Sequence, residues 1–237
     1  TPRQCKVTVA GREHIFPCIC NCQKEELEAA KRRAEEAERR IRIQRLRANG
    51  IQERHLLDWT FDQAQDTRYV RMAKNYVEHW WQVKEQNLGL LLWGDVGTGK
   101  SFLAACIANA LIERGVPVLM TNFSKILNQM GGMYSEERYR YIASFSQFPL
   151  LVIDDLGIER GTEYALEQVY GVVDERYKSG LPLLVTTNLT IHEIRNATDV
   201  AHARIFSRLL EMCTPVHIAG HDRRTAIGTA KQELVKE

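Results

Sequence analysis

LGLLLWGDVGTGKS, residues 88–101, joins an apolar run to a glycine-rich loop, and this combination decides the fold of the chain. The apolar run predicts a strand buried on both faces, and residues 100–114 predict a helix. The loop between them, residues 94–101, matches the phosphate-binding pattern G-x-x-x-x-G-K-[ST] at every fixed position. Because the pattern needs a strand before it and a helix after it, this context indicates a P-loop.

The loop contains the residue types that nucleotide binding requires. Glycines at 94, 97 and 99 let it turn tightly and direct backbone N–H groups at phosphates. Lys100 is expected to reach the β- and γ-phosphates of ATP, and the Ser101 hydroxyl to ligate Mg²⁺. The alternative is a glycine-rich turn that binds nothing. The expected ATP-binding residues are Gly94, Asp95, Val96, Gly97, Thr98, Gly99, Lys100, Ser101 and Asp154.

A second apolar strand, in LLVIDDLG (150–157), ends in two carboxylates. Parallel sheets bind ligands at the carboxyl ends of their strands, so Asp154 and Asp155 are expected beside the loop. We predict that Asp154 holds Mg²⁺ through water and that Asp155 orients or deprotonates the attacking water. The alternative is a strand that ends in an acidic turn.

A third apolar strand, LPLLVTTN (181–188), also ends in polar residues. Asn188 follows Asp155 by one strand-and-helix unit, so we predict that it hydrogen-bonds the attacking water or the γ-phosphate. An asparagine after a strand also commonly starts a turn, and this remains the alternative.

The alternation of strands and helices extends over the chain from about residue 50. It predicts a strand at 116–121, irregular helical structure at 124–147, and helices at 68–84, 163–178 and 201–212. The inward face of the 68–84 helix is expected to carry Val70, Ala73, Val77 and either Trp80 or Trp81. The pattern predicts an α/β fold in which helices flank a central parallel sheet.

The first 49 residues have a different composition. Residues 1–23 are rich in cysteine and too poor in apolar side chains to form a core. Residues 24–48 contain no Gly or Pro, and Glu repeatedly precedes Arg by four positions, which predicts a solvated helix. We therefore expect a Cys-rich module at 1–23, a charged helical linker at 24–49 and an ATP-binding domain at 50–237.

Four cysteines cluster in the first region: Cys5, Cys18, Cys20 and Cys22. In a cytosolic protein such a cluster suggests a metal before a disulfide, and Zn²⁺ could fold a segment too small to fold unaided. We predict a zinc site formed by these thiolates, with His14 as a substitute ligand. Free thiols and disulfides are the alternatives, since C-x-C is less usual than C-x-x-C.

Charge is unevenly distributed along the 237 residues. The net charge is +2, but residues 1–50 hold 12 Lys and Arg against 7 Glu, which gives +5 there and −3 elsewhere. The run RRIRIQRLR (39–47) could contact nucleic acid or an acidic protein, or form a solvated helix face. No apolar run approaches the ~20 residues of a membrane span, and no signal pattern follows the first residue. We expect a cytoplasmic protein with no membrane partner.

Together these motifs resemble the AAA+ ATPases. The Walker A loop (94–101), the Walker B strand (150–155), a sensor asparagine at 188 and arginines near the C-terminus come in the family's order. Within AAA+, the chain is similar over residues 50–224 to replicative helicase loaders of the DnaC/DnaI type, with IstB-like ATPases as nearest relatives. The matching segments include GIQERHLLDWTFDQ (50–63) and ARIFSRLLEMC.

This resemblance implies an arginine finger, which completes the site of a neighbouring subunit, in the helix matching ARIFSRLL. Arg208 is the first choice and Arg204 the second, one helical turn apart on the same face; Arg223 and Arg224 could also approach nucleotide. Either arginine could instead simply solvate or cap its helix. Asp155 replaces the Glu of many relatives, and its shorter side chain suits slow turnover.

Residues 122–147 correspond to a segment that faces single-stranded DNA in loader- and initiator-type AAA+ proteins. An ordinary surface helix is the alternative. The side chains suited to phosphate contact and base stacking are Lys125, Arg138, Tyr139, Arg140 and Tyr141.

The resemblance implies an ATPase, slow and stimulated by its partner, that assembles with ATP into an oligomer and delivers a hexameric replicative DNA helicase onto single-stranded DNA. The Cys-rich module would grip the helicase. Two alternatives are an IstB-type transposition helper, which lacks such a module, and a nucleotide-gated adaptor with little hydrolysis.

Overall fold

The protein is described here from a computed structural model, which describes residues 3–9, 11–18, 21–157 and 162–220. The chain divides into two compact units, Thr1–Gln44 and Arg45–Glu237. The boundary between them falls inside a helix, a few residues before the end expected for the linker.

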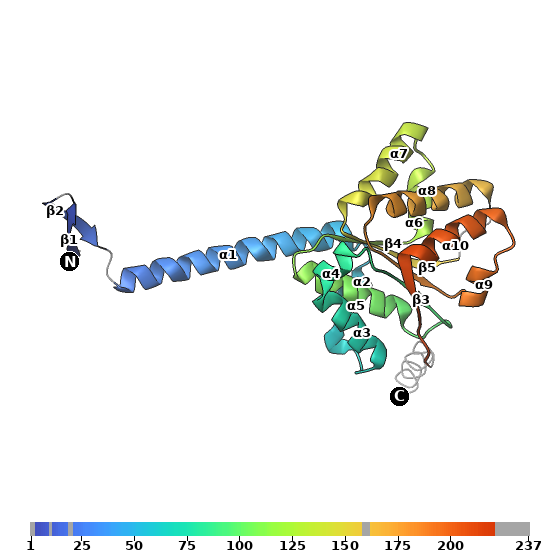
Figure 1. Ribbon diagram of the computed structural model, residues 1–237, viewed down its shortest axis with the longest axis horizontal. Coiled ribbons are helices and arrows are strands. Elements are labelled where there is room, and N and C mark those ends of the chain that lie inside the picture. Colours follow the sequence, from blue (N-terminus) through green and yellow to red (C-terminus); the bar gives the residue numbers. More distant parts are fainter. Residues whose placement is uncertain (1–2, 10, 19–20, 158–161, 221–237) are drawn as a thin grey trace, which may run out of the picture. The chain divides into compact units, whose positions relative to one another are not determined.

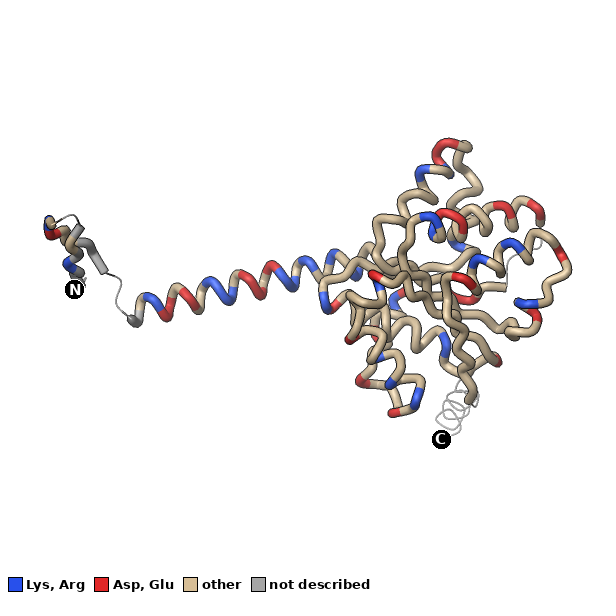
Figure 2. The backbone as a smooth tube through the Cα atoms, in the orientation of Figure 1, with Lys and Arg blue, Asp and Glu red and all other residues tan. Residues whose placement is uncertain are grey.

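The first unit contains a β-hairpin and most of a long helix. Strands β1 (Arg3–Val9) and β2 (Arg12–Cys18) pair antiparallel around a turn in which Gly11 has φ +78°. Helix α1 (Asn21–Gly50) has 30 residues; Lys or Arg alternates with Glu as far as Glu38, and the charged residues after it are all Arg (Figure 2). Most of its described side chains are exposed, as expected for a solvated helix.

Helix α1 ends in the second unit because the chain must approach the sheet closely there. A Cβ on Gly50 would lie 2.0 Å from the carbonyl oxygen of Val118, so a larger residue would displace backbone. The next residue, Ile51, is buried and forms a parallel bridge with Met120. Glycine at this position therefore allows the segment after α1 to join the edge of the sheet.

The second unit is built on a five-stranded sheet in which every strand pair is parallel. The strand order is β4-β5-β6-β3-β7. The strands are β3 (Gly89–Trp93), β4 (Val118–Thr121), β5 (Leu150–Leu156), β6 (Leu183–Thr187) and β7 (Cys213–His217). The apolar interior positions of β3, β4, β5 and β6 are buried on both faces, which explains their continuous apolar sequences.

Helices cover both faces of this sheet (Figure 1). One face carries α5 (Lys100–Glu113), which packs against α3 (Arg68–Glu78). The opposite face forms the main apolar core with α6 (Phe123–Met130), α8 (Glu163–Ser179) and α10 (Val200–Met212). The shorter elements are α2 (Arg54–Leu57), η1 (Phe61–Gln63), α4 (Trp80–Glu85), α7 (Ser135–Ser144), η2 (Phe145–Gln147) and α9 (Ile191–Arg195).

The predicted α/β architecture is confirmed, with differences in detail. The helix expected at 68–84 divides at His79 into α3 and α4. Its inward face is as predicted, and Trp80 is the buried tryptophan, whereas Trp81 is 72% exposed. The sequence analysis missed β7, since CTPVH is short and contains Pro215. Proline is tolerated there because β7 is an edge strand.

A buried arginine fixes the amino-terminal ends of two central strands. Arg176 on α8 is 1% exposed and donates to the carbonyl oxygens of Phe148 (2.9 Å), Pro149 (2.8 Å) and Pro182 (3.1 Å). Burial lowers the pKa of Arg176 to about 10. These contacts tie the segment before β5 to the segment before β6, so the two strands keep a common register.

Candidate functional site

A pocket of about 400 Å³ opens at the carboxyl ends of β3, β5 and β6. It brings together side chains that lie far apart in sequence, and five of them were predicted to act together: Lys100, Ser101, Asp154, Asp155 and Asn188. The full lining is Trp59, Gln63, Val96, Gly97, Gly99, Lys100, Ser101, Phe102, Asp154, Asp155, Thr186 and Asn188.

The glycine loop adopts conformations that explain its sequence. Gly94, Gly97 and Gly99 have φ of +142°, +80° and +95°, in a region that L side chains rarely adopt. Gly94 also needs space, because a Cβ there would lie 2.5 Å from the carbonyl oxygen of Ile218. Gly99 is the N-cap of α5, so the loop ends at a helix N-terminus, where backbone N–H groups favour anions.

Lys100 begins α5 and is 6% exposed. Its ammonium donates to the carbonyl oxygens of Gly94 (2.8 Å) and Asp95 (2.7 Å), at the start of the loop. The Thr98 hydroxyl donates to the same Asp95 carbonyl (2.9 Å). These contacts hold the loop closed around a buried positive charge, which is the arrangement that a polyphosphate would recognise.

The two aspartates sit on an irregularity of the sheet. Ile153 pairs with Val185 and Leu156 with Thr187, so Asp154 and Asp155 together face Thr186. Asp155 has φ +60°, a left-handed conformation that costs about 1–2 kcal/mol for a residue with a side chain. Consecutive strand residues normally point to opposite faces. This bulge instead lets both carboxylates line the same pocket.

Thr186 links the two aspartates and was missed by the sequence analysis. Its hydroxyl accepts a hydrogen bond from the Asp155 backbone N–H (2.8 Å) and donates one to Asp154 Oδ1 (2.6 Å). Asn188 Nδ2 donates to Asp155 Oδ1 (3.0 Å). Thr186 is 1% exposed, and the signal for its role was a pair of threonines at the end of an apolar strand. One strand end thus orients both carboxylates.

Two aromatic side chains, Trp59 and Phe102, also line the pocket, which was unexpected. The Trp59 ring lies 5.7 Å from the Phe102 ring and 5.2 Å from the His55 ring, measured between centroids. Trp59 and Gln63 precede the P-loop by over thirty residues, so no local pattern connected them with it. The available signal was the segment GIQERHLLDWTFDQ, which carried the resemblance without an assigned role.

Of the described residues, neither Arg204 nor Arg208 lines this pocket. Both extend from α10 toward α8, over the Tyr170 ring, at 4.5 Å and 4.6 Å from its centroid. Arg208 forms an ion pair with Asp174, and Arg204 donates to the Tyr170 hydroxyl (3.1 Å). Arg204 and Arg208 thus lie on the same face of α10, as predicted. Arg223 and Arg224 lie outside the described residues.

The segment expected to face DNA has most of its polar groups engaged within the chain. Lys125 pairs with Glu53 (2.5 Å), and Arg140 pairs with Glu136. The Tyr141 hydroxyl donates to Gln129 (2.9 Å). The Arg138 guanidinium donates to the Met133 carbonyl (2.9 Å), while Tyr139 is 70% exposed.

The predicted zinc ligands lie largely outside the description. Cys20 is not described, and the side chains of Cys5, Cys18 and Cys22 are not either. The hairpin register pairs Cys5 with Phe16 and Arg3 with Cys18, so the two cysteines occupy diagonal positions. Among the side chains that are described, no group of three or more His, Cys, Asp or Glu is placed to hold a metal.

The pocket suits Mg²⁺–ATP in size and chemistry. Ser101 and Asp154 offer a hydroxyl and a carboxylate in the lining of this pocket, and hard cations such as Mg²⁺ prefer oxygen ligands. The described helices include none that is both long and apolar enough to cross a bilayer.

A P-loop at a helix N-terminus, two aspartates on β5, one strand removed from β3, and a parallel five-stranded sheet define an ATP-binding AAA+-type ATPase domain. The chain belongs to the family of IstB-like ATP binding proteins, whose model matches residues 22–228. ATP binding, and ATPase activity in general, follow from this membership.

Several of the proteins to which the chain is similar are replicative helicase loaders. The chain is 29% identical over 150 residues to the replicative helicase loader DnaI of Bacillus subtilis, covering 57% of this chain and 47% of that protein. It is 31% identical over 143 residues to the replicative helicase loader DnaC of Escherichia coli K12, covering 58% and 55%. The chain thus spans about half the length of these relatives. A crystal structure of DnaI superposes with a TM-score of 0.59 at 26% identity, covering 72% of this chain and 93% of that one.

Proposed function

We propose that the protein is an ATP-dependent loader that delivers a hexameric replicative DNA helicase onto single-stranded DNA in the cytoplasm. The observation that carries this proposal is a pocket that brings the P-loop, both aspartates and Asn188 together, in a chain that is similar to the loaders DnaI and DnaC. A loader needs a switch, and an ATP site built from several strands provides one.

Within this site each polar group has a separate task. Lys100 and the N–H groups of the loop hold the phosphates, while Ser101 and Asp154 hold Mg²⁺, which neutralises phosphate charge. Thr186 engages Asp154 Oδ1, so the other carboxylate oxygen is directed to the hydrated metal. Asp155 accepts a proton from the attacking water or orients it, and Asn188 fixes the Asp155 carboxylate from its far side.

Turnover is slow and depends on a partner in this proposal. Asp155 has one methylene fewer than Glu, and its backbone is already committed to a left-handed conformation. The carboxylate therefore has little freedom to follow the water. Slow hydrolysis keeps the ATP-bound state long-lived until the partner promotes the reaction.

The adenine base binds at the aromatic end of the pocket. The phosphates are held at Lys100, and the base reaches Trp59, Gln63 and Phe102, which also line the pocket. An aromatic face stacks on any base, whereas the Gln63 amide can both donate to and accept from a base edge.

Completion of the site requires a second subunit. Arg208 and Arg204 lie away from the pocket of their own chain, which is the placement needed for a finger that acts on a neighbour. Self-assembly with ATP would bring this face of α10 to the next pocket. An arginine that neutralises transition-state charge in this way contributes about 10³–10⁵ in rate.

The N-terminal unit grips the helicase, with Cys5, Cys18, Cys20 and Cys22 binding Zn²⁺. The diagonal placement of Cys5 and Cys18 in the hairpin supports this, since it brings two ligand positions together. Tyr139 and the neighbouring Tyr134, 70% and 82% exposed, are the aromatic groups available for single-stranded DNA.

A pulldown with the cognate replicative helicase tests the function directly. The full chain should retain the helicase, and ATP against ADP should change the amount retained. Chelation of zinc should release the helicase without reducing ATP affinity. Failure to bind the helicase, together with stimulation by a transposase, would support the IstB-type alternative. Helicase binding that requires ATP without any hydrolysis would support the adaptor.

A further inference from the structure

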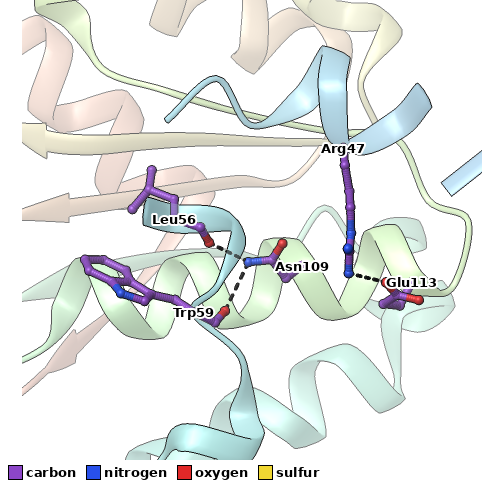
Figure 3. A network of polar contacts seen from close by, with 5 residues as sticks. All are labelled: Arg47, Leu56, Trp59, Asn109 and Glu113. Atoms are coloured by element: carbon purple, nitrogen blue, oxygen red, sulfur yellow. Dashed lines mark hydrogen bonds and ion pairs between the residues drawn. The ribbon is translucent and has the colours of Figure 1, made fainter. Parts of the chain in front are cut away.

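One buried amide connects the P-loop helix to the segment that carries Trp59 (Figure 3). Asn109 lies on α5, is 2% exposed, and its Nδ2 donates to the carbonyl oxygens of Leu56 (2.7 Å) and Trp59 (3.0 Å). Its neighbours among the buried residues of α5 are apolar, including Ala108 and Leu111. A polar residue among them needs a specific explanation, because burying an amide is costly unless it is hydrogen-bonded.

Of the two carbonyls that Asn109 engages, that of Leu56 lies in the very short helix α2 and that of Trp59 lies two residues after its end. Helix α2 has four residues, so its last carbonyls have few partners within the helix. The Trp59 N–H donates to the Leu56 carbonyl (3.3 Å), which forms a single turn, and the Asn109 amide adds a donor from another element. The backbone at Trp59 is therefore fixed by α5 and not by its own secondary structure.

The position of Asn109 along α5 relates this anchor to the nucleotide. Lys100 and Ser101 begin the helix at the phosphate end of the pocket. Asn109 is seven residues beyond Phe102, which is about 10 Å along a helix axis. The Trp59 backbone is held near Asn109, while its ring reaches back to Phe102 at 5.7 Å. One rigid helix thus sets the spacing between the phosphate site and the aromatic wall.

We propose that Asn109 is a positioning residue for nucleotide recognition, which holds the Trp59 backbone so that the indole forms the wall on which the base stacks. The inference rests on the proposed base contact with Trp59. It assigns to Asn109 a contribution to the affinity for the base and ribose, and none to the affinity for the phosphates.

The test compares two ligands, Mg²⁺–ATP and Mg²⁺–tripolyphosphate, which share the phosphate chain but not the base. Affinities of the full chain are measured by calorimetry, with tripolyphosphate in competition against ATP. Asn109→Leu removes both hydrogen bonds at similar volume. We expect it to weaken ATP binding about tenfold, within the range of a base stack on an aromatic ring, and to change tripolyphosphate binding less than twofold. Asn109→Ala is the second variant, should leucine not fold.

Two further variants separate this role from general damage to α5. Trp59→Ala should weaken ATP as much as Asn109→Leu does, and the double variant should be no weaker than Trp59→Ala alone, because both changes remove one contact. Glu113→Gln is the matched control. Glu113 lies one turn beyond Asn109 and pairs with Arg47. Its replacement by glutamine should leave the affinities for ATP and for tripolyphosphate unchanged.

Each outcome has one meaning. Equal losses for ATP and tripolyphosphate would show that Asn109 supports the whole helix and would overturn the inference. If Asn109→Leu binds ATP as the wild type does while Trp59→Ala binds it more weakly, the inference about Asn109 is wrong and the proposed base contact with Trp59 stands. An unchanged ATP affinity in Trp59→Ala would instead refute the base contact on which the inference rests.

Discussion

The nucleotide pocket and the α8–α10 face, which we define by Tyr170, Asp174, Arg204 and Arg208, are both rich in charge. The two regions obtain their geometry differently. In the pocket, backbone conformation places the charges: glycines with positive φ shape the loop, and a bulge turns two consecutive aspartates the same way. On the α8–α10 face, long side chains reach each other from regular helices, as Arg208 reaches Asp174 and Tyr170. Because the backbone fixes the pocket, an isolated chain already has the geometry for binding ATP. A face made of long side chains can exchange partners, which suits contact with another subunit.

The largest effect on ATP affinity is expected at Lys100. Lys100→Ala removes the buried cation inside the loop, and we expect ATP affinity to fall by more than 100-fold, since charge-assisted contacts to phosphate are lost. Calorimetric titration with Mg²⁺–ATP measures it. Lys178→Ala on α8, where the lysine pairs with Asp174, is the control and should bind ATP normally. Unchanged affinity in Lys100→Ala would refute the P-loop assignment.

The α8–α10 face should matter only in assemblies. Arg208→Ala should bind ATP like the wild type but lose about 10³-fold in hydrolysis measured with helicase and single-stranded DNA present. Mixing it with Lys100→Ala should restore part of the activity, because a mixed interface pairs an intact loop with an intact finger. An inactive mixture of demonstrably co-assembled chains would make Arg204 the candidate. Full activity of Arg208→Ala as a monomer would contradict a shared site.

Within the pocket, the two aspartates should differ in role. Asp155→Asn leaves Ser101 and Asp154 free to hold Mg²⁺, so ATP binding should persist. Hydrolysis should fall about 10²–10⁴-fold, since the amide cannot accept a proton. Steady-state phosphate release and ATP titration measure the two effects separately. Turnover at the wild-type rate would identify another residue as the base.

The same contrast explains what the sequence could predict. The loop at 94–101 and the aspartates near the end of β5 were found because each motif is contiguous in the sequence. Thr186, Trp59 and Asn109 were not, because their contacts join residues that are 31, 43 and 50 positions apart. The bulge at Asp155 could not be predicted either, since it depends on the pairing of β5 with β6.

The smallest expected effect, and the sharpest test of backbone control, concerns Thr186. Thr186→Val keeps the shape of the side chain but removes the hydroxyl that joins the Asp155 N–H to Asp154 Oδ1. The N–H then loses its partner, which costs about 1–3 kcal/mol of stability. The bulge should relax, and both carboxylates should shift by small amounts.

Because Lys100 and the loop are untouched by this change, Thr186→Val should bind ATP within twofold of the wild type. Hydrolysis should fall about tenfold, since small displacements of a catalytic group are costly. Thr214→Val, at an exposed position of the edge strand β7, makes the same chemical change and should alter neither quantity. If Thr186→Val loses stability but hydrolyses ATP at the wild-type rate, the bulge is maintained by the sheet itself. Placement of the aspartates would then depend on strand pairing alone, and the contrast with the α8–α10 face would be stronger still.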